Sequence, residues 1–231
     1  MAAFALKWDQ EGQKIIEAGV DRGVLYVYNP DSENLDSKYC PGEAWNGLTS
    51  VSESPSGADS NKQYADNTIY ANLRGTEEFG GTIECFTFPD GFYECNGMTE
   101  IATGVYAGQQ NRKTFGFCFR TLIGSDTEAL GDKGYKLHLI YGATVSPSES
   151  SHETINESPE GETLSFEFDT VPVESETVTT LKRTSQLIVD STKTTAEGLA
   201  ALEAALYGSA NSDPYLPLPD KVIELCGAVT P

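Results

Sequence analysis

Hydrophobic and polar residues alternate along much of this chain with the period of two that is typical of β-strands. The clearest example is the segment 115–123, in which Phe115, Phe117 and Phe119 share one side. Clusters of Asn, Asp, Gly, Pro and Ser separate such segments and indicate turns. The pattern predicts about eight strands, which span residues 22–28, 44–51, 63–73, 79–88, 115–123, 135–145, 164–168 and 186–189.

The side chains of one predicted strand divide clearly between two faces. In the segment 79–88, Ile83 and Cys85 are expected to point one way, and Glu84 and Phe86 the other. Thr87 joins the first side and Phe88 the second.

Helices are predicted only near the end of the chain. The first begins after Thr194 or Thr195, whose hydroxyl would cap it, and ends at Tyr207 before Gly208. A second, short helix is predicted at 220–226. Strands followed by helices favour an antiparallel β-sandwich or barrel with one flanking helix and a short C-terminal helix, a mainly β fold (all-β to α+β).

The chain is interpreted as one domain over residues 1–231. Two stretches rich in Ser, Asn, Asp and Gly, at about 30–62 and 146–161, are predicted to be long loops, and residues 208–231 a C-terminal arm. Loops of such length in a compact domain usually have a function.

The chain carries 35 acidic and 15 basic residues, a formal net charge of −20. This charge excludes an ordinary nucleic-acid binder, because affinity for phosphates comes mainly from clustered Lys and Arg. Residues 145–178 contain no Lys or Arg, and they are either a solvated face or a surface that repels polyanions. The acidic residues of that stretch are Glu149, Glu153, Glu157, Glu160, Glu162, Glu167, Asp169, Glu174 and Glu176.

Catalytic and metal-binding signatures are not found in the sequence. His138 lies in a strand pattern and His152 in an acidic loop, so neither indicates a catalytic base. The pairs Glu77 with Glu78 and Glu167 with Asp169 could in principle hydrolyse glycosides, but such neighbours arise easily among so many acids. We therefore expect no enzyme, no cofactor and no metal site; the segment 31–36 lacks the Gly and closing Glu of a calcium loop.

Cysteine usage and hydropathy indicate an intracellular, non-membrane chain. No apolar run approaches the roughly 20 residues that span a bilayer, and the N-terminus lacks the features of a signal peptide. Five cysteines at irregular spacing predict reduced, packed thiols and not a disulfide framework: Cys40, Cys85, Cys95, Cys118 and Cys226.

A series of ordered sequence blocks resembles the major tail protein, or tail tube protein, of bacteriophages with long non-contractile tails. The blocks cover residues 6–12, 17–26, 44–49, 53–58, 64–67, 78–80, 88–90, 108–116 and 135–143. The match is weakest at 31–41 and beyond 208.

This resemblance implies a β-sandwich or barrel of the tail-tube type, flanked by a helix, that assembles into stacked rings, usually hexameric. It implies contacts with further copies in the ring and between rings through the long loops, a tape-measure protein in the lumen, and tail terminator and baseplate or tip proteins. DNA would pass through without specific binding, and no membrane would be involved. The protein would be made in the host cytoplasm and reside in the virion tail.

An acidic lumen would keep DNA phosphates from adhering during ejection. The candidate lumen-facing residues are Glu77, Glu78, Glu84, Glu162, Glu167 and Asp169.

The alternative is a monomeric β-sandwich binding module, such as a receptor-binding or carbohydrate-binding domain or a capsid decoration protein. In that case Trp8 and Trp45 are the first candidates for stacking on a sugar ring.

Overall fold

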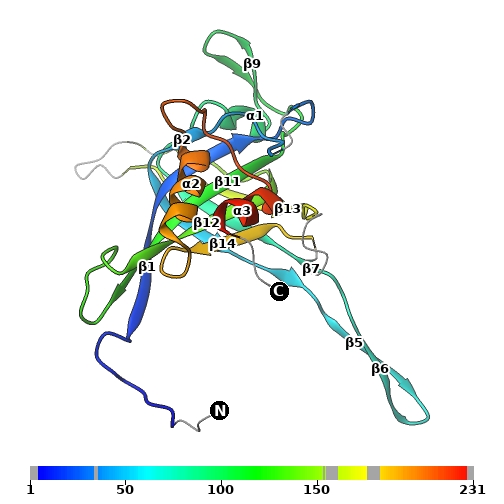
Figure 1. Ribbon diagram of the computed structural model, residues 1–231. Helices are drawn as coiled ribbons and strands as arrows, with labels where there is room; N and C mark the ends of the chain where they lie inside the picture. Colours follow the sequence, from blue (N-terminus) through cyan, green and yellow to red (C-terminus); the bar gives the residue numbers. More distant parts are fainter. Residues whose placement is uncertain (1–4, 34–35, 153, 155–160, 176–182, 228–231) are drawn as a thin grey trace.

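The computed structural model describes residues 5–33, 36–152, 154, 161–175 and 183–227. It confirms a mainly β, antiparallel fold with flanking helices (Figure 1). The strands are β1 (Ile15–Val27), β2 (Glu43–Trp45), β3 (Leu48–Glu53), β4 (Ser56–Gly57), β5 (Ser60–Ala65), β6 (Thr68–Arg74), β7 (Glu77–Glu78), β8 (Gly80–Cys85), β9 (Thr99–Ala102), β10 (Val105–Ala107), β11 (Phe115–Ser125), β12 (Gly134–Val145), β13 (Leu164–Thr170) and β14 (Gln186–Asp190). The helices are α1 (Phe92–Cys95), α2 (Ala196–Tyr207) and α3 (Pro219–Cys226).

One 8-stranded antiparallel sheet forms the body, in the order β2-β1-β11-β12-β13-β8-β3, with β14 paired to β12 beside this path. Strand β12 changes its partner along its length. Residues 136–140 pair with β14, and residues 143–145 pair with β13. The sheet is thereby divided into a first half, β2-β1-β11-β12-β14, and a second half, β13-β8-β3.

An apolar core lies between the two halves. Phe117 and Ile140 from the first half and Phe168 from the second are buried in the same cluster. The sheet therefore curls around this cluster, and its edge strands β2 and β3 are separated in the chain only by Asn46 and Gly47. The strand pairing of the described residues does not close, so the arrangement is a curled, sandwich-like sheet and not a closed barrel.

A second apolar core lies between the first half and the helices. Leu139 of β12 packs in this cluster with Leu202 of α2 and Val222 of α3. The Tyr26 hydroxyl donates a 2.6 Å hydrogen bond to the Leu206 carbonyl, which ties β1 to α2. We call the first half the helix-backed half and the second the open half, because α2 and α3 cover only the former (Figure 1).

The predicted helix boundaries are confirmed by the local chemistry. The Thr195 hydroxyl accepts a hydrogen bond from the Gly198 backbone N–H at the start of α2. Gly208, with a φ of 80°, ends the helix. Helix α3 begins one residue before the predicted 220–226 segment, with Pro219 in its first turn.

Strands β3 to β8 form one long hairpin. Its base is the β3–β8 pair inside the sheet, and the pairs β4–β7 and β5–β6 continue outward from it. Asp66 and Asn67, with φ of 52° and 62°, make the turn at its tip. We call residues 56–78 the arm, which projects far from the body in Figure 1. A shorter hairpin of β9 and β10 projects from another side.

The structure corrects several predictions for residues 30–107. The strand predicted at 44–51 is present as β2 and β3, but the part of the predicted loop that follows it is wrong, because it contains β4 and the start of β5. The strand predicted at 63–73 is instead the turn of the arm with parts of two strands. Elements α1, β9 and β10 were not predicted. The strands β5, β6 and β9 were missed or misplaced because they expose most of their side chains. Their sequences therefore show no alternation of hydrophobic and polar positions.

The other long loop and the end of the chain are described only in part. Residues 146–152 contain no strand or helix, as predicted. Residues 153, 155–160 and 228–231, which belong to the predicted loop and the predicted C-terminal arm, lie outside the described residues, as do residues 176–182 of the acidic stretch.

Candidate functional surfaces

The outward residues of the paired parts of β3, β8 and β13 are polar. The register places Ser50 and Ser165 beside Glu84, and Ser52 and Glu167 beside Thr82. The alternate residues of the same strands, such as Ile83 and Phe166, are buried in the core. We call the outward set the acid face: Ser50, Ser52, Thr82, Glu84, Ser165, Glu167 and Asp169.

Three of the six acids predicted for a lumen share this face. Glu84 accepts a 2.8 Å hydrogen bond from the Ser50 hydroxyl, and Glu167 and Asp169 are exposed. No basic residue occupies any of the acid-face positions, so a polyanion approaching it meets only carboxylates and hydroxyls.

The other three predicted acids lie elsewhere. Glu77 and Glu78 form β7 in the arm, and both are exposed. Glu162 precedes β13 and faces His152, whose Nδ1 lies 3.0 Å from its Oε2. The structure thus brings together half of the predicted set, and strand register is the reason.

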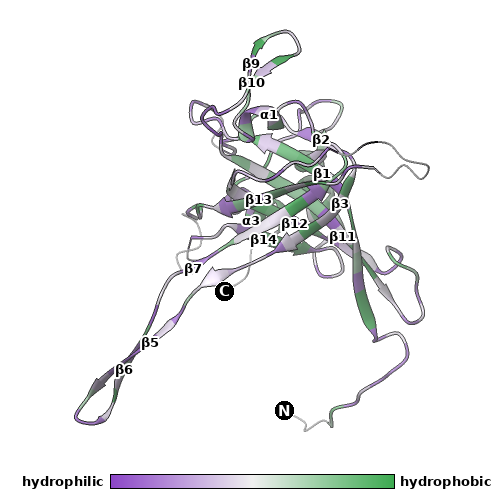
Figure 2. Cartoon of the chain, turned by 180° about the vertical axis from the view of Figure 1, so that it is seen from behind, coloured by the Kyte–Doolittle hydropathy of each residue, from purple (hydrophilic) through white to green (hydrophobic). Residues whose placement is uncertain are grey.

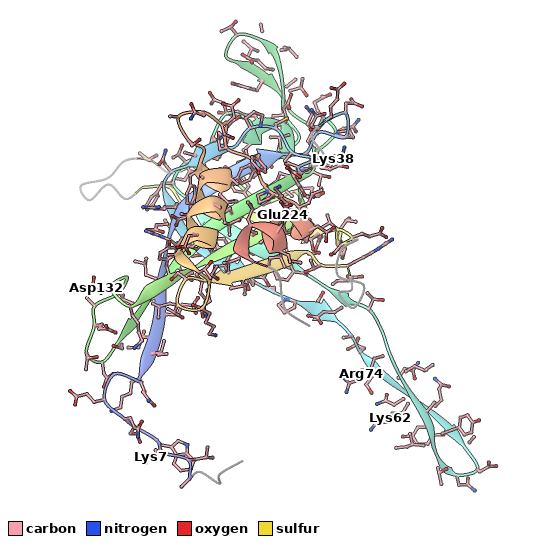
Figure 3. The ribbon with its side chains drawn as sticks, viewed as in Figure 1. Lys7, Lys38, Lys62, Arg74, Asp132 and Glu224 are labelled. Atoms are coloured by element: carbon pink, nitrogen blue, oxygen red, sulfur yellow. The ribbon has the colours of Figure 1, made fainter. Side chains whose placement is uncertain are left out.

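The arm exposes large apolar side chains on a hydrogen-bonded hairpin. Tyr64, Ile69, Tyr70 and Leu73 are all exposed, Tyr70 at 77%. Lys62 and Arg74 also project from the arm, and Asp66 is the single acid between residues 60 and 74 (Figure 3). The outer part of the arm, residues 60–74, therefore has a formal charge of +1 (two basic residues, one acidic), whereas the whole arm, which also contains Asp59, Glu77 and Glu78, has a formal charge of −2.

Two further projections expose apolar residues. On the β9–β10 hairpin, Ile101 and Val105 are exposed, while Tyr106 stacks on Tyr93 with ring centroids 4.0 Å apart. Figure 2 shows hydrophobic colour on this hairpin and on the projecting part of β1. Exposed apolar groups on structured projections are typical of surfaces that contact another protein.

A polar cluster connects the two halves of the sheet. The side chain of His138 on β12 is 9% exposed and stacks on Phe119, with ring centroids 4.5 Å apart. Its Nδ1 lies 3.3 Å from Glu53 Oε1 on β3, an ion-pair distance without hydrogen-bond geometry. Its Nε2 lies 3.0 Å from the Thr121 hydroxyl and 3.6 Å from Glu17 Oε1. His138 is thus a packed strand residue, as the sequence pattern suggests.

The carboxylates of this cluster have shifted pKa values. The adjacent His138 imidazole lowers the pKa of Glu53, against the effect of burial. For Glu17, burial opposes ionisation, but the contacts with Lys136 and Thr121 leave its pKa lowered. A carboxyl with a lowered pKa stabilises the fold above its unfolded pKa, and this stabilisation is lost as the pH falls through the folded value.

We expect His138→Gln to flatten the acid side of the stability profile. The wild type should lose thermal stability as the pH falls below the ordinary pKa of a glutamate and through the lowered pKa of Glu53. The variant should start lower and lose less over that range. His152→Gln, which changes an exposed ion pair, is the matched control and should follow the wild type. Equal acid slopes in all three proteins would contradict a role for this cluster.

Several other candidate residues have structural positions. Trp45 is 2% exposed and packs against Phe92 and Phe117, so it cannot stack on a sugar, whereas Trp8 is exposed. All five cysteines are free thiols, and burial raises the pKa of Cys95 to about 12.

The described part of the chain contains neither a metal-binding cluster nor a membrane-spanning helix. No group of three or more His, Cys, Asp or Glu side chains there could hold a metal ion. Within the same part of the chain, every helix is too short or too polar to cross a membrane.

Comparison with known proteins identifies no family for this chain. Neither a protein-family model nor a curated protein matches this chain. A chain of the sheath–tube complex of an extracellular contractile injection system, PVC, in its extended state is similar over 73% of this chain and 88% of its own. The two share 13% sequence identity with a TM-score of 0.31.

Proposed function

We propose that this chain is a tail tube protein of a bacteriophage with a long non-contractile tail, a structural subunit without catalytic activity. Its copies form stacked hexameric rings that make a conduit for DNA. The observation that carries this proposal is the long hairpin over residues 48–85, whose base contributes two strands to the acid face and whose outer part is an exposed arm.

The arm supports self-assembly. A two-stranded hairpin with exposed Tyr64 and Tyr70 gains little from folding by itself, since its side chains bury almost nothing within the subunit. Its apolar side chains become buried once another copy covers them. The positive charge of Lys62 and Arg74 also suits a partner as acidic as this chain.

The acid face supports a conduit for DNA. It is opposite to the helix-covered side of the molecule, so a ring with the helices outward would turn this face toward the centre. Glu84, Glu167 and Asp169 would then repel phosphates along the channel. The sequence resemblance to tail tube proteins also supports a conduit for DNA.

The proposed location is the phage tail, after synthesis in the host cytoplasm. The proposed partners are further copies of the chain, a tape-measure protein in the lumen during assembly, and terminator and baseplate or tip proteins at the tail ends. DNA would be in transient contact only.

Electron microscopy of concentrated protein over a series of salt concentrations tests this function. We expect rings or tubes in the wild type. The double variant Tyr64→Ser and Tyr70→Ser should assemble far less, with an unchanged melting temperature, because both side chains are exposed in the subunit. Val171→Ser, which changes another exposed apolar residue, is the control and should assemble normally.

The binding-module alternative predicts a different result. Light scattering would then show one monomer peak at every concentration, and electron microscopy would show no rings or tubes in any salt. Buried Trp45 already removes one of the two tryptophans on which that alternative depends.

A further inference from the structure

One region of the sheet has open edges on both sides. In the part of the sheet that contains the start of β1, before the residues that pair with β2, the strands follow the order β1-β11-β12-β14. Strand β2 pairs only with residues 23–25 of β1, so residues 15–18 have no strand on their outer side among the described residues. Strand β14 pairs with β12. On its other side, Thr184 forms a bridge with Val173 just before the strand begins, and no described strand pairs with residues 186–190 there. Open edges of this kind readily accept a strand from another chain.

The backbone of β14 directs hydrogen-bonding groups outward at Ile188. Ser185 and Ser191, at the two ends of β14, bond to Tyr141 and Tyr135 of β12. Because alternate residues of a strand address opposite sides, Leu187 and Val189 also face β12. The N–H and C=O of Ile188 therefore point to the open side.

The same reasoning places Glu17 at the open edge of β1. The N–H of Ser125 and the C=O of Ile123 bond within the β11–β12 turn, on the side away from β1. Gly124, between them, therefore faces β1 and pairs with Ile16 there. The backbone groups of Glu17, the next residue of β1, consequently point outward.

The direction of the two open strands is compatible with joining them. Each neighbouring pair in β1-β11-β12-β14 is antiparallel, so β1 and β14 run in opposite directions. When the β14 edge of one copy meets the β1 edge of the next, the new pair is antiparallel too. Four strands per copy can thus repeat without any change in the pairing pattern.

Apolar side chains accompany both edges. Ile15 and Ile16 on β1 are 63% and 57% exposed, and Ile188 on β14 is 51% exposed. Beside β14 lies a groove of about 510 Å³ lined by β14 and by Val222 and Ile223 of α3. A strand added to β14 would bury Ile188 and cover one side of this groove.

We propose that the outer edge of β1 in one copy pairs with the outer edge of β14 in the next copy, head to tail. This inference rests on the proposed function and names the strands that join the subunits of a ring. The occupant is a second copy because both halves of the joint are present on opposite sides of the same sheet, in compatible directions. A head-to-tail contact of this kind produces closed rings or open filaments, whereas pairing of identical edges stops at a dimer.

Two single variants and their mixture test the pairing. Ile16→Lys places a charge at the β1 edge, and Ile188→Lys places one at the β14 edge. At concentrations at which the wild type assembles, each variant alone should stay monomeric. Its critical concentration for assembly should be raised roughly tenfold or more. Each retains one intact edge, so when both also carry Tyr64→Ser and Tyr70→Ser in the arm, an equimolar mixture should form a one-to-one dimer and nothing larger in sedimentation velocity. Val171→Lys, at an exposed position outside both edges, should assemble like the wild type.

Other outcomes contradict the pairing. A variant that assembles like the wild type, a variant that dimerises by itself, or a mixture that stays monomeric would each overturn it. Melting temperatures check that the variants fold. If a lysine variant fails to fold, Ile16→Cys and Ile188→Cys copies, both in a Cys226→Ser background, replace it. A short thiol-reactive linker should join the two only in their mixture.

The experiment separates this inference from the proposed function. If the wild type forms tubes and both lysine variants do as well, the function stands and the pairing is wrong. If the wild type forms neither rings nor tubes but the mixture still dimerises, the pairing stands and the tube function is wrong.

Discussion

Phe92→Ala is expected to lower the free energy of unfolding by about 3–5 kcal/mol, a large part of the total for a single domain. The ring of Phe92 is fully buried and lies at the centre of an aromatic cluster in the core between the sheet halves. Its ring centroid is within 5.7 Å of those of Trp45, Phe88, Phe115 and Phe166. Truncation removes contacts with all four rings and leaves a cavity that a close-packed core cannot fill.

Urea denaturation followed by tryptophan fluorescence measures this effect, since Trp45 is in contact with the mutated side chain. Phe86→Ala is the matched control, because Phe86 is 55% exposed on the outer side of the open half. The control should change stability by less than about 1 kcal/mol. Equal losses in the two variants would show that Phe92 does not hold the core together.

Reversing the charges of the acid face is expected to make assembled tubes retain DNA. In the triple variant Glu84→Lys, Glu167→Lys and Asp169→Lys, three carboxylates that repel phosphates become ammonium groups that bind them. Three phosphate contacts would give a logarithmic dependence of binding on salt with a slope of about −2.7. Wild-type tubes should retain no DNA at the same salt concentrations.

Release of DNA from tubes at increasing salt, followed by fluorescence of a labelled strand, measures this effect. The matched control carries the same charge change on the helix-backed side, in Asp132→Lys, Glu197→Lys and Glu224→Lys. Figure 3 shows Asp132 in the β11–β12 turn and Glu224 on α3, and neither position belongs to the strands of the acid face. If the control retains as much DNA as the acid-face variant, only net charge matters and the acid face does not line the channel.

The local elements of the body follow from nearby residues. The Thr195 cap and Gly208 stop define α2, and the alternation in residues 115–123 defines β11, because these signals depend only on neighbours in the chain. The two faces predicted for residues 79–88 hold as far as Phe86, since Ile83 and Cys85 are buried and Phe86 is exposed; after β8 ends, Thr87 is exposed and Phe88 packs against the core, opposite to the prediction.

The arm and α1 show where such local signals fail. The arm strands leave nearly every side chain exposed, so no alternation marks them, and the turn at Asp66 and Asn67 is read as part of a strand. The helix α1 has only four residues, and it forms because Phe92 is drawn into a core built by distant strands. Neither element is defined by a pattern within its own segment.

The candidate lumen acids divide for a similar reason. The sequence by itself determined that the chain is acidic, is mainly β and has two helices near its C-terminal end. Net charge, the period of hydrophobic positions and helix capping are all properties of residues close together in the chain. Only the tertiary structure decided that Glu84, Glu167 and Asp169 share one bare face while Glu162 does not. It also decided which edges, β1 and β14, stay open, because strand order and register come from pairing between segments far apart in the chain.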